Sequence, residues 1–318
     1  MKILSILLAL AGLLIATAIV AWTGIGAVKQ AVLTAGLGGF ALFTLCQFML
    51  FLILGTAWQV LTPEIRLQKL IYSRMVRDAA SNCLPFSHLG GIALGVRTAI
   101  LNGVPWARAA ASSTADVTAE FFAQISFALM SLAWLLWRVP GSAIIRPVGL
   151  ALVAAVPVIA AFFLVQRGAG SAFAFLGKQI TGDWGEKADH GAGKIDAAFA
   201  EIYAAPRRLA WSAGLHVLGW WGAGVASFVA FRALGTHIGL LDAMAVEGLV
   251  DAAMIFAFII PGQLGAQEAA WVAMGAAFGV AAPVCLAVSL MRRARDIGLG
   301  VPVLLAWQAV EGRRTLKK

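Results

Sequence analysis

Residues 260–268 read Ile-Pro-Gly-Gln-Leu-Gly-Ala-Gln-Glu, and residues 84–91 read Leu-Pro-Phe-Ser-His-Leu-Gly-Gly. Both segments interrupt long apolar stretches with residues that break helices. A backbone N–H or C=O without a partner is costly in lipid, so broken helices are tolerated where they line a cavity or are packed inside protein. The two segments therefore predict a protein-lined interior. The predicted helix breaks are Pro85, Gly90, Gly91, Pro261, Gly262 and Gly265.

The composition is that of a membrane protein. Of the 318 residues, 61% are hydrophobic and 12% are charged, and the mean hydropathy is +0.88. No Asp, Glu, Lys or Arg occurs between Lys29 and Glu64 or between Arg208 and Arg232. Because a spanning helix needs about 20 apolar residues, such gaps are long enough to cross a bilayer. The sequence therefore predicts a multi-pass membrane protein.

The net charge of +9 does not indicate nucleic-acid binding, because lysines and arginines stand in short connections and at the C-terminal tail rather than in a basic patch with aromatic residues. We interpret these residues as anchors that set the orientation of the spans. Arg66, Lys69, Arg74 and Arg77 then mark one connection as cytoplasmic, since positive residues favour that side.

The predicted fold is all-α, a polytopic transmembrane helical bundle with about seven full spans and two broken or re-entrant helical segments. Residues 1–318 form a single integral membrane domain in this interpretation, and residues 167–207 form a hydrophilic loop that can include a short surface helix. The broken helices fall at 84–102 and 261–280. The spans fall at 3–22, 37–61, 109–137, 144–166, 208–231, 242–260 and 283–310.

A shift of 176 residues aligns the two broken segments and indicates an internal repeat with halves around 37–137 and 208–310. The shift brings proline onto proline, Gly-Val onto Gly-Val and acid onto acid, at Pro85 and Pro261, Gly103-Val104 and Gly279-Val280, and Glu120 and Asp296. The order of the predicted segments also recurs: an apolar span, a helix break, a short helix, a turn and a helix that carries acids. Repeats with interrupted helices point to a transporter's central site. Coincidence in a chain rich in glycine and alanine is the alternative.

Charged residues inside apolar stretches are the candidate site, because an ionisable group in the bilayer needs a partner, an interface or a function. Asp116 and Glu120 are four residues apart and share one helix face. They either lie at a helix N-terminus in the interface, where the helix dipole favours acids, or face a polar interior. Glu247 and Asp251 repeat the same spacing ahead of the second break.

Arginines interrupt the last apolar stretch. Arg292 can pair with Asp296 along one helix, which leaves Arg293 and Arg295 to find partners elsewhere, in other acids of the fold or in a lipid phosphate. Each of these charged residues has two alternative roles, structural ion pairing or contact with a substrate. The predicted substrate-binding or translocation residues are Glu268, Arg292, Arg293, Asp296, Gln263, Gln267, Asp116, Glu120 and Arg97.

Recognisable catalytic or metal-binding patterns are not found in the sequence. The four histidines have no ligand spacing, the three cysteines have neither metal nor disulfide spacing, and no nucleotide-binding loop or nucleophile elbow occurs. We therefore expect no metal, no cofactor and no enzymatic activity.

The second broken segment and the following Phe278-Gly279-Val280, Ser289-Leu290 and Arg293-Ala294-Arg295-Asp296 resemble the lysylphosphatidylglycerol-synthase transmembrane, flippase-like superfamily. Within it, Arg77-Asp78-Ala79-Ala80, the first broken segment, residues 116–120 and Leu304-Leu305-Ala306-Trp307-Gln308 are most similar to the HpnL branch, which is associated with hopanoid biosynthesis. One departure is Gln263, where many relatives have a second glycine.

The resemblance implies a lipid-translocating domain of the kind that moves aminoacylated phosphatidylglycerol between leaflets. In bifunctional relatives a soluble C-terminal domain performs aminoacyl transfer, so we do not expect synthase activity here. The first hypothesis is a lipid flippase or transporter of the bacterial inner membrane that handles hopanoid or related lipids. The alternative is a membrane accessory or scaffold protein that transports nothing and has lipid-biosynthesis enzymes as partners. The sequence leaves the oligomeric state open.

Overall fold

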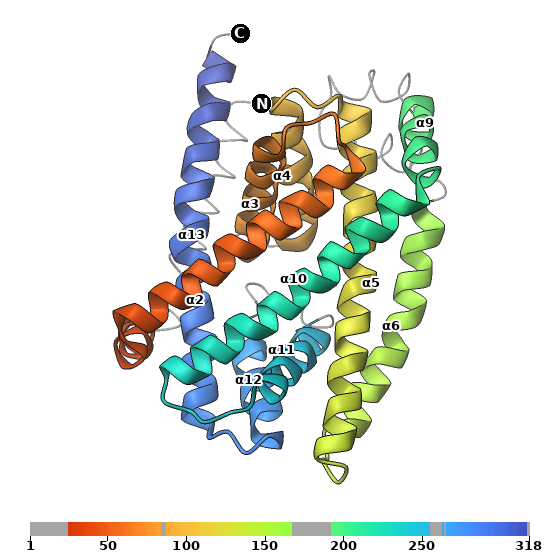
Figure 1. Cartoon of the computed structure of the whole chain (residues 1–318). Coiled ribbons are helices and arrows are strands. Elements are labelled where there is room, and N and C mark those ends of the chain that lie inside the picture. Colours follow the sequence, from red (N-terminus) through yellow and green to blue (C-terminus); the bar gives the residue numbers. More distant parts are fainter. Residues whose placement is uncertain (1–24, 84–86, 167–191, 255–262, 264, 317–318) are drawn as a thin grey trace.

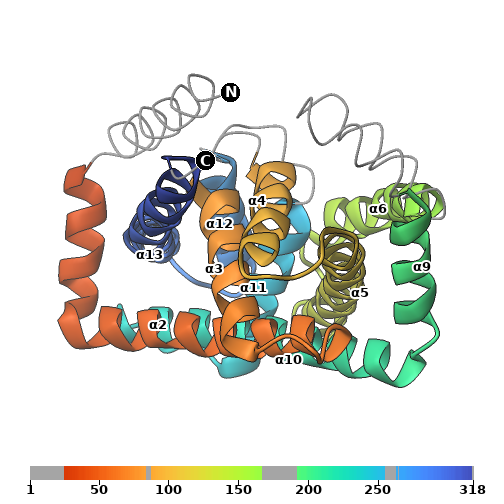
Figure 2. The ribbon, with the colours of Figure 1, turned by 90° about the horizontal axis from the view of Figure 1, so that it is seen from above.

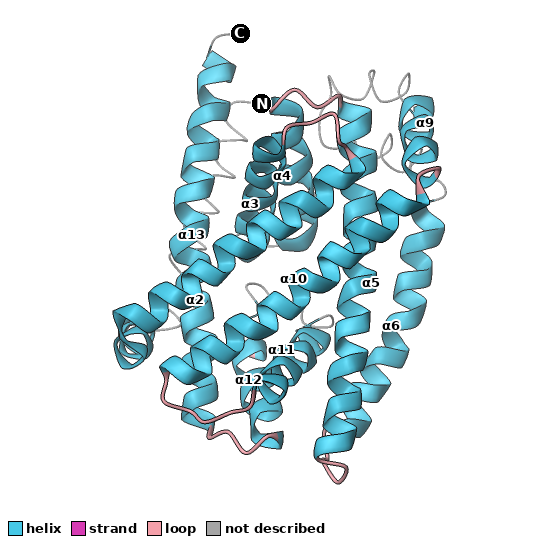
Figure 3. Cartoon of the chain, in the orientation of Figure 1, coloured by secondary structure: helices cyan, strands magenta, loops and turns pink. Residues whose placement is uncertain are grey.

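The computed structural model describes residues 25–83, 87–166, 192–254, 263 and 265–316, and all regular structure within these ranges is helical (Figure 3). The helices are α2 (Ile25–Leu61), α3 (Leu67–Cys83), α4 (Ser87–Leu101), α5 (Trp106–Arg138), α6 (Ile145–Gln166), α9 (Ala192–Tyr203), α10 (Pro206–Ala233), α11 (Leu240–Met254), α12 (Ala266–Ala277) and α13 (Ala282–Leu316). The all-α prediction is confirmed.

Long apolar stretches form helices because a helix pairs its own backbone N–H and C=O groups where lipid offers no partner. Within the described ranges, three helices are long and apolar enough to cross a membrane, at Lys29–Leu61, Trp106–Arg138 and Pro206–Ala233, and shorter apolar helices lie at Gly90–Leu101 and Ile145–Ala154. Their outward side chains are large and apolar: Leu37, Trp137 and Leu150 are each at least 70% exposed. Such a surface is suited to lipid.

The predicted spans agree in place with α2, α5, α6, α10 and α13. The predicted span at 242–260 begins with α11, and its end lies outside the described residues, as do the first span at 3–22 and most of the hydrophilic loop. The end of that loop holds α9, whose inner face packs Ile195, Phe199 and Ile202 on the bundle. The total of seven spans and the division into halves stay predictions.

Helices α2 and α10 lie side by side, run in opposite directions and form one layer, across which the remaining bundle packs (Figures 1 and 2). Helices α5 and α13 also run in opposite directions, on the two sides of the bundle (Figure 1). Helix α3 lies between them and contacts α2, α4 and α13. An inverted repeat, with α2 to α5 matching α10 to α13, would have opposite directions of this kind, and the repeat stays a prediction.

Two turns show the correspondence in the backbone. Gly103 and Gly279 are 176 residues apart and have positive φ angles of 92° and 75°. In each turn the glycine N–H donates to the carbonyl three residues earlier, and the N–H of the following valine, Val104 or Val280, donates to the carbonyl five residues earlier. Helices α5 and α13 then begin at the same offset. The 176-residue shift read from the sequence is therefore also a shift between matching backbone turns.

Helix α3 was not among the predicted elements. Arg74 and Arg77 lie on it and are 3% and 7% exposed, so they are not the solvated charges of a cytoplasmic connection that the sequence suggested. Only the start of the segment is at the surface, where Lys69 donates to the carbonyl of Asn102 at 2.6 Å. The sequence is misleading here because the mean hydropathy of α3 is low, while its charges are neutralised by partners from another helix.

Close contact between α3 and α4 depends on glycine. A Cβ on Gly91 would lie 2.7 Å from the carbonyl oxygen of Arg77, and one on Gly95 would lie 2.9 Å from the Cβ of Arg77. Both Gly90 and Gly91 were predicted to break a helix. They lie inside α4, which starts at Ser87, so they do not break one. The adjoining Pro85 lies outside the described residues, as do Pro261 and Gly262.

We predict that Gly103→Ala and Gly279→Ala each lower the free energy of unfolding by about 1–2 kcal/mol, because an L-residue is strained at positive φ. Steric overlap does not contribute, since Gly279 has open space around its Cβ position and Gly103 has only the Lys69 ammonium at 3.8 Å. Thermal unfolding of the purified protein in detergent measures the loss.

Gly298→Ala is the matched control, because Gly298 also has open space but lies inside α13 without positive φ. This substitution should raise the stability slightly, since alanine favours helix. Equal behaviour of the three variants would contradict the structural role of the two turns.

Candidate functional site

Two arginines of α3 face two acids of α5 in the interior. Arg77 Nη1 lies 2.9 Å from Asp116 Oδ2, and Arg74 Nη2 lies 2.5 Å from Glu120 Oε1. Arg77 also pairs with Glu120, and Arg74 Nη1 lies 3.4 Å from Asp116 Oδ2. Spacings of three and four residues put each pair on one helix face. The four side chains therefore form a crossed set of charge-assisted hydrogen bonds.

Further groups complete this arrangement, which we call the first charge cluster: Arg74, Arg77, Asp78, Asp116 and Glu120. Asp78 accepts from Arg74 Nε at 3.0 Å within α3. Helix α10 adds His216, whose Nε2 lies 2.9 Å from Asp116 Oδ1, and Trp220, whose indole N–H donates to the Glu120 carbonyl at 3.4 Å. His216 and Asp116 are fully buried. The cluster thus joins α3, α5 and α10.

The second charge cluster consists of Glu247 and Asp251 of α11 and Arg292 of α13. Arg292 Nη1 pairs with Glu247, and its Nη2 lies 3.5 Å from Asp251 Oδ1. The Ser227 hydroxyl of α10 donates to the other oxygen of Glu247. Glu247 and Asp251 are 1% and 7% exposed. They are interior residues, and not acids solvated at the start of a span.

Separate pairs hold the next two arginines of α13. Arg293 Nη2 lies 2.7 Å from Glu268 Oε1, while Glu268 Oε2 accepts the Gly265 backbone N–H at 2.9 Å and so caps α12. Arg295 pairs with Asp296 at 2.8 Å and stacks over the Phe43 ring at 4.7 Å. The partner of Arg293 agrees with one of the predicted options. Asp296 pairs with Arg295 and not with Arg292, because Arg292 turns toward α11.

The two clusters correspond at one position, where the sign of the charge changes. Asp116 of the first cluster and Arg292 of the second are 176 residues apart, whereas Glu120 and Asp296, at the same offset, are both acids. In the first cluster the inner helix α3 carries arginines and α5 carries acids; in the second, α11 carries acids and α13 carries the arginine. Ion pairs thus join α3 to α5 and α11 to α13, with the acid on α5 in the first case and on α11 in the second.

A central cavity of about 220 Å³ lies between the clusters. Helices α2, α3, α10 and α13 supply most of its lining, and Glu120, Glu247 and Trp271 add to it from α5, α11 and α12. Its charged lining residues are Arg74, Arg77, Arg292, Arg295, Asp78, Glu120, Glu247 and Asp296. Both halves of the predicted repeat thus contribute charges of both signs to one space.

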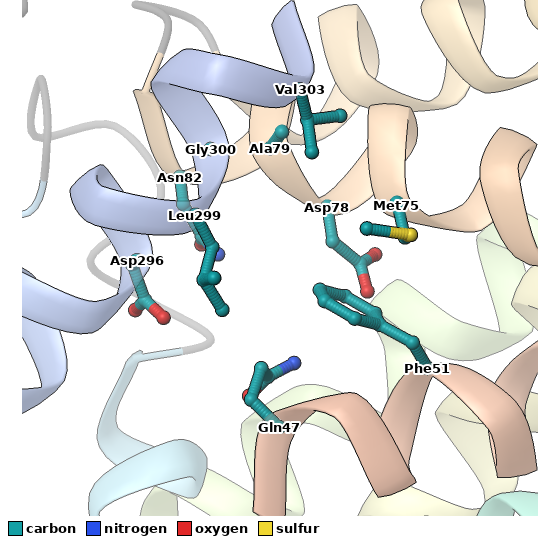
Figure 4. Close-up of a pocket in the computed structure, with 10 residues that line it drawn as sticks. All are labelled: Gln47, Phe51, Met75, Asp78, Ala79, Asn82, Asp296, Leu299, Gly300 and Val303. Atoms are coloured by element: carbon teal, nitrogen blue, oxygen red, sulfur yellow. The ribbon is translucent and has the colours of Figure 1, made fainter. Parts of the chain in front are cut away.

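A smaller pocket of about 20 Å³ adjoins the cavity between α2, α3 and α13 (Figure 4). Gln47, Asp78 and Asp296 converge on it from these three helices and also line the central cavity. A space of this size holds about one water molecule. Helices α3 and α13 close it tightly, since a Cβ on Gly300 would lie 2.6 Å from the Cys83 sulfur.

Three of the nine predicted site residues, Glu120, Arg292 and Asp296, line the cavity. Asp116 contacts the lining residue Arg77, while Arg293 and Glu268 pair with each other and do not line the cavity. Gln267 donates to Ser289 Oγ at 3.2 Å, on α13. Asp116 is not at a helix N-terminus, because α5 begins at Trp106.

Two predicted residues are placed differently. Arg97 pairs with Glu311 at 2.5 Å, its side chain is 34% exposed, and it does not line the cavity. Gln263 has φ 51°, the one positive φ of a residue other than glycine in the part of the chain that the structure describes. A positive φ is a conformation that glycine adopts without strain, so Gln263 occupies a position suited to glycine. Gly265 has φ 78° and directly precedes α12.

Sequence reasoning missed Arg74, Arg77 and His216. The two arginines share a face at a spacing of three residues, which matches the face of Asp116 and Glu120, and this spacing was the available signal. His216 carries no such signal, because a single histidine in an apolar helix has no patterned partner.

The fold and the site define an all-helical membrane protein with a charged interior between inverted helix pairs. The chain matches the family described as the lysylphosphatidylglycerol synthase TM region over residues 9–303 and belongs to it. This membership supports a membrane location and a role connected with membrane lipids. Searches of curated proteins and of solved structures return no match to the chain.

We predict that Asp116→Ala lowers the free energy of unfolding by about 3–5 kcal/mol, because it leaves buried guanidinium charge without its partner. Arg77 would retain Glu120 alone. Chemical or thermal unfolding in detergent measures the change.

Arg138→Ala is the comparison, since Arg138 is 57% exposed in its side chain and lies 3.8 Å from Asp242. Loss of an exposed pair should cost at most about 1 kcal/mol. An Asp116→Ala protein as stable as the Arg138→Ala protein would show that the first charge cluster does not hold α3 to α5.

Proposed function

We propose that the protein moves lipids between the leaflets of the bacterial inner membrane, with hopanoid or related lipids as substrates and without catalysing a chemical reaction. The observation that carries the proposal is the central cavity, where charges from both inverted helix pairs meet inside an apolar bundle. Membership in a lipid-related family supports it. Polar groups in a membrane interior mark substrate pathways in transporters.

The size of the cavity fits a headgroup and not a whole lipid. About 220 Å³ accommodates a small polar group, while the apolar part of the lipid stays against the apolar outer faces of the helices. Guanidinium groups such as Arg292 donate hydrogen bonds to phosphate or hydroxyl oxygens, and carboxylates accept them from hydroxyl or amine groups. The headgroup thereby crosses without losing all hydrogen bonds.

The small pocket between α2, α3 and α13 is the proposed lateral entrance (Figure 4). It shares Gln47, Asp78, Asn82 and Asp296 with the cavity, and it is too narrow for a headgroup in this conformation. Separation of α3 from α13 along the Gly300 contact would open it. The inverted arrangement gives the protein a way to expose the cavity alternately to the two sides.

The direct test uses purified protein in vesicles that carry a fluorescent lipid in both leaflets and a quencher that reaches only the outer leaflet. Transport predicts complete quenching, where empty vesicles lose only the outer-leaflet signal. Quenching equal to that of empty vesicles, together with no bound lipid in the purified protein, would contradict the proposal. Co-purification with lipid-biosynthesis enzymes in that case would favour the accessory or scaffold role.

We predict that Ala223→Trp slows lipid movement at least about tenfold, equivalent to about 1.4 kcal/mol in the barrier. Ala223 lines the central cavity on α10, so the indole would occupy the space proposed for the headgroup without removing a charge. The vesicle assay gives the rate.

Val225→Trp is the matched control, because Val225 is on the same helix, is 40% exposed and does not line the cavity. The control protein should keep the wild-type rate. Equal rates for Ala223→Trp and wild type would show that the headgroup does not pass through this cavity.

A further inference from the structure

The second charge cluster has more acid than base. Glu247 and Asp251 both lie within 4 Å of Arg292, and the remaining partner, Ser227, is neutral. With both carboxyls ionised, the cluster holds one uncompensated negative charge among residues that are almost completely buried. An unpaired buried charge is strongly unfavourable.

Among the described residues, groups on the neighbouring helices do not supply the missing positive charge. On α13, Arg295 pairs with Asp296, and Arg293 pairs with Glu268 of α12. On α5, Arg138 lies at Asp242, near the start of α11, while Asp116 and Glu120 belong to the first charge cluster. On α10, His216 contacts Asp116 and Arg232 contacts His237. The charged residue of α6, Arg146, is exposed.

One carboxylate oxygen of Asp251 indicates that a proton completes the cluster. Its Oδ2 atom is buried and has no hydrogen-bond partner among the described residues. The Asp251 and Glu247 carboxyls are four residues apart on one face of α11, and both contact the same guanidinium, that of Arg292. Two like-charged carboxylates that share one guanidinium do not both ionise readily. A single proton would neutralise the excess charge and satisfy the oxygen.

The first charge cluster has a different composition. It holds three carboxyls against the guanidinium groups of Arg74 and Arg77, and His216 contacts Asp116 directly. In the second cluster no histidine stands within the described surroundings, so an acid must carry the proton itself.

We propose that Glu247 and Asp251 form a binding site for one exchangeable proton, and that the loading of this site is coupled to movement of the headgroup. The coupling rests on the proposed function, whereas proton binding does not. A proton taken from water binds an oxygen of the pair and leaves one carboxylate for Arg292. Arg292 lines the central cavity, and its side chain is 25% exposed. The guanidinium is then free to donate to an acceptor on the headgroup.

Release of the proton reverses this sequence. Two carboxylates then compete for Arg292 and draw it back toward α11, which weakens its bond to the headgroup. Each cycle would thus move one proton with one headgroup, and a proton gradient would drive lipid movement. Ser227 links the pair to α10, so the change in charge also reaches the layer formed by α2 and α10.

The first experiment detects the proton without lipid transport. Infrared difference spectra of the wild-type protein in vesicles, recorded between low and high pH, should contain the C=O stretch of a buried carboxylic acid. Asp251→Asn keeps the shape of the side chain and removes the proton site, so this band should disappear. Asp242→Asn is the matched control, because it makes the same change on the same helix at a residue paired with Trp134 and Arg138.

The second experiment imposes a pH gradient on the same vesicles and follows lipid movement. Lipid movement by the wild-type protein should respond to the gradient, with its rate changing by up to about tenfold per pH unit for one proton. Lipid movement by the Asp242→Asn protein should respond in the same way. Asp251→Asn should abolish the response. Correct folding of each variant is checked by its thermal unfolding midpoint.

The outcomes separate the two proposals. A carboxylic acid band that vanishes in Asp251→Asn, without any lipid movement in the wild type, supports the proton site and contradicts the transport function. Lipid movement that ignores the pH gradient overturns the coupling. Absence of the band at every pH, or a response to a sodium gradient alone, overturns the proton site itself.

Discussion

The pairing of buried charges is the constraint on which the rest of the structure depends. Lipid offers no water to solvate a guanidinium or a carboxylate, so each must find its partner inside the bundle. Arg77 and Asp116 bring α3 to α5, and Arg292 and Glu247 bring α13 to α11. These contacts join helices far apart in the sequence, and the apolar surfaces alone would not select such partners, because lipid is as apolar as they are.

Reversed polarity gives the repeated scaffold an internal asymmetry. Asp116 and Arg292 occupy matching positions, yet one is the acid and the other the base of its cluster. An inverted pair with equal charges would present the same potential from both ends of the cavity. The charges that α3 and α11 supply to the cavity differ, since α3 contributes Arg74, Arg77 and Asp78 and α11 contributes Glu247. This arrangement orients a polar group in the cavity.

The sequence predicted the fold class, the places of the long helices and the 176-residue offset between the turns at Gly103 and Gly279, because these depend on local apolar length and on turn residues. It also identified Glu120, Arg292 and Asp296, since a charge within an apolar run is visible without structure. It did not identify α3 as a buried helix. The burial of Arg74 depends on acids 42 and 46 residues further along the chain, and hydropathy averages hold no information about such partners.

Helix α10 connects the two clusters mechanically. His216 contacts the first and Ser227 donates to the second, and a spacing of eleven residues is close to three helical turns, which puts both side chains on one face about 16 Å apart. Gly219, Trp220 and Ala223 line the central cavity between them. A change of charge in either cluster therefore acts on the same rigid helix that forms the cavity wall. Because α10 also packs along α2, a small displacement at Ser227 would move the wall and the layer together, so that the state of one cluster influences the contacts of the other.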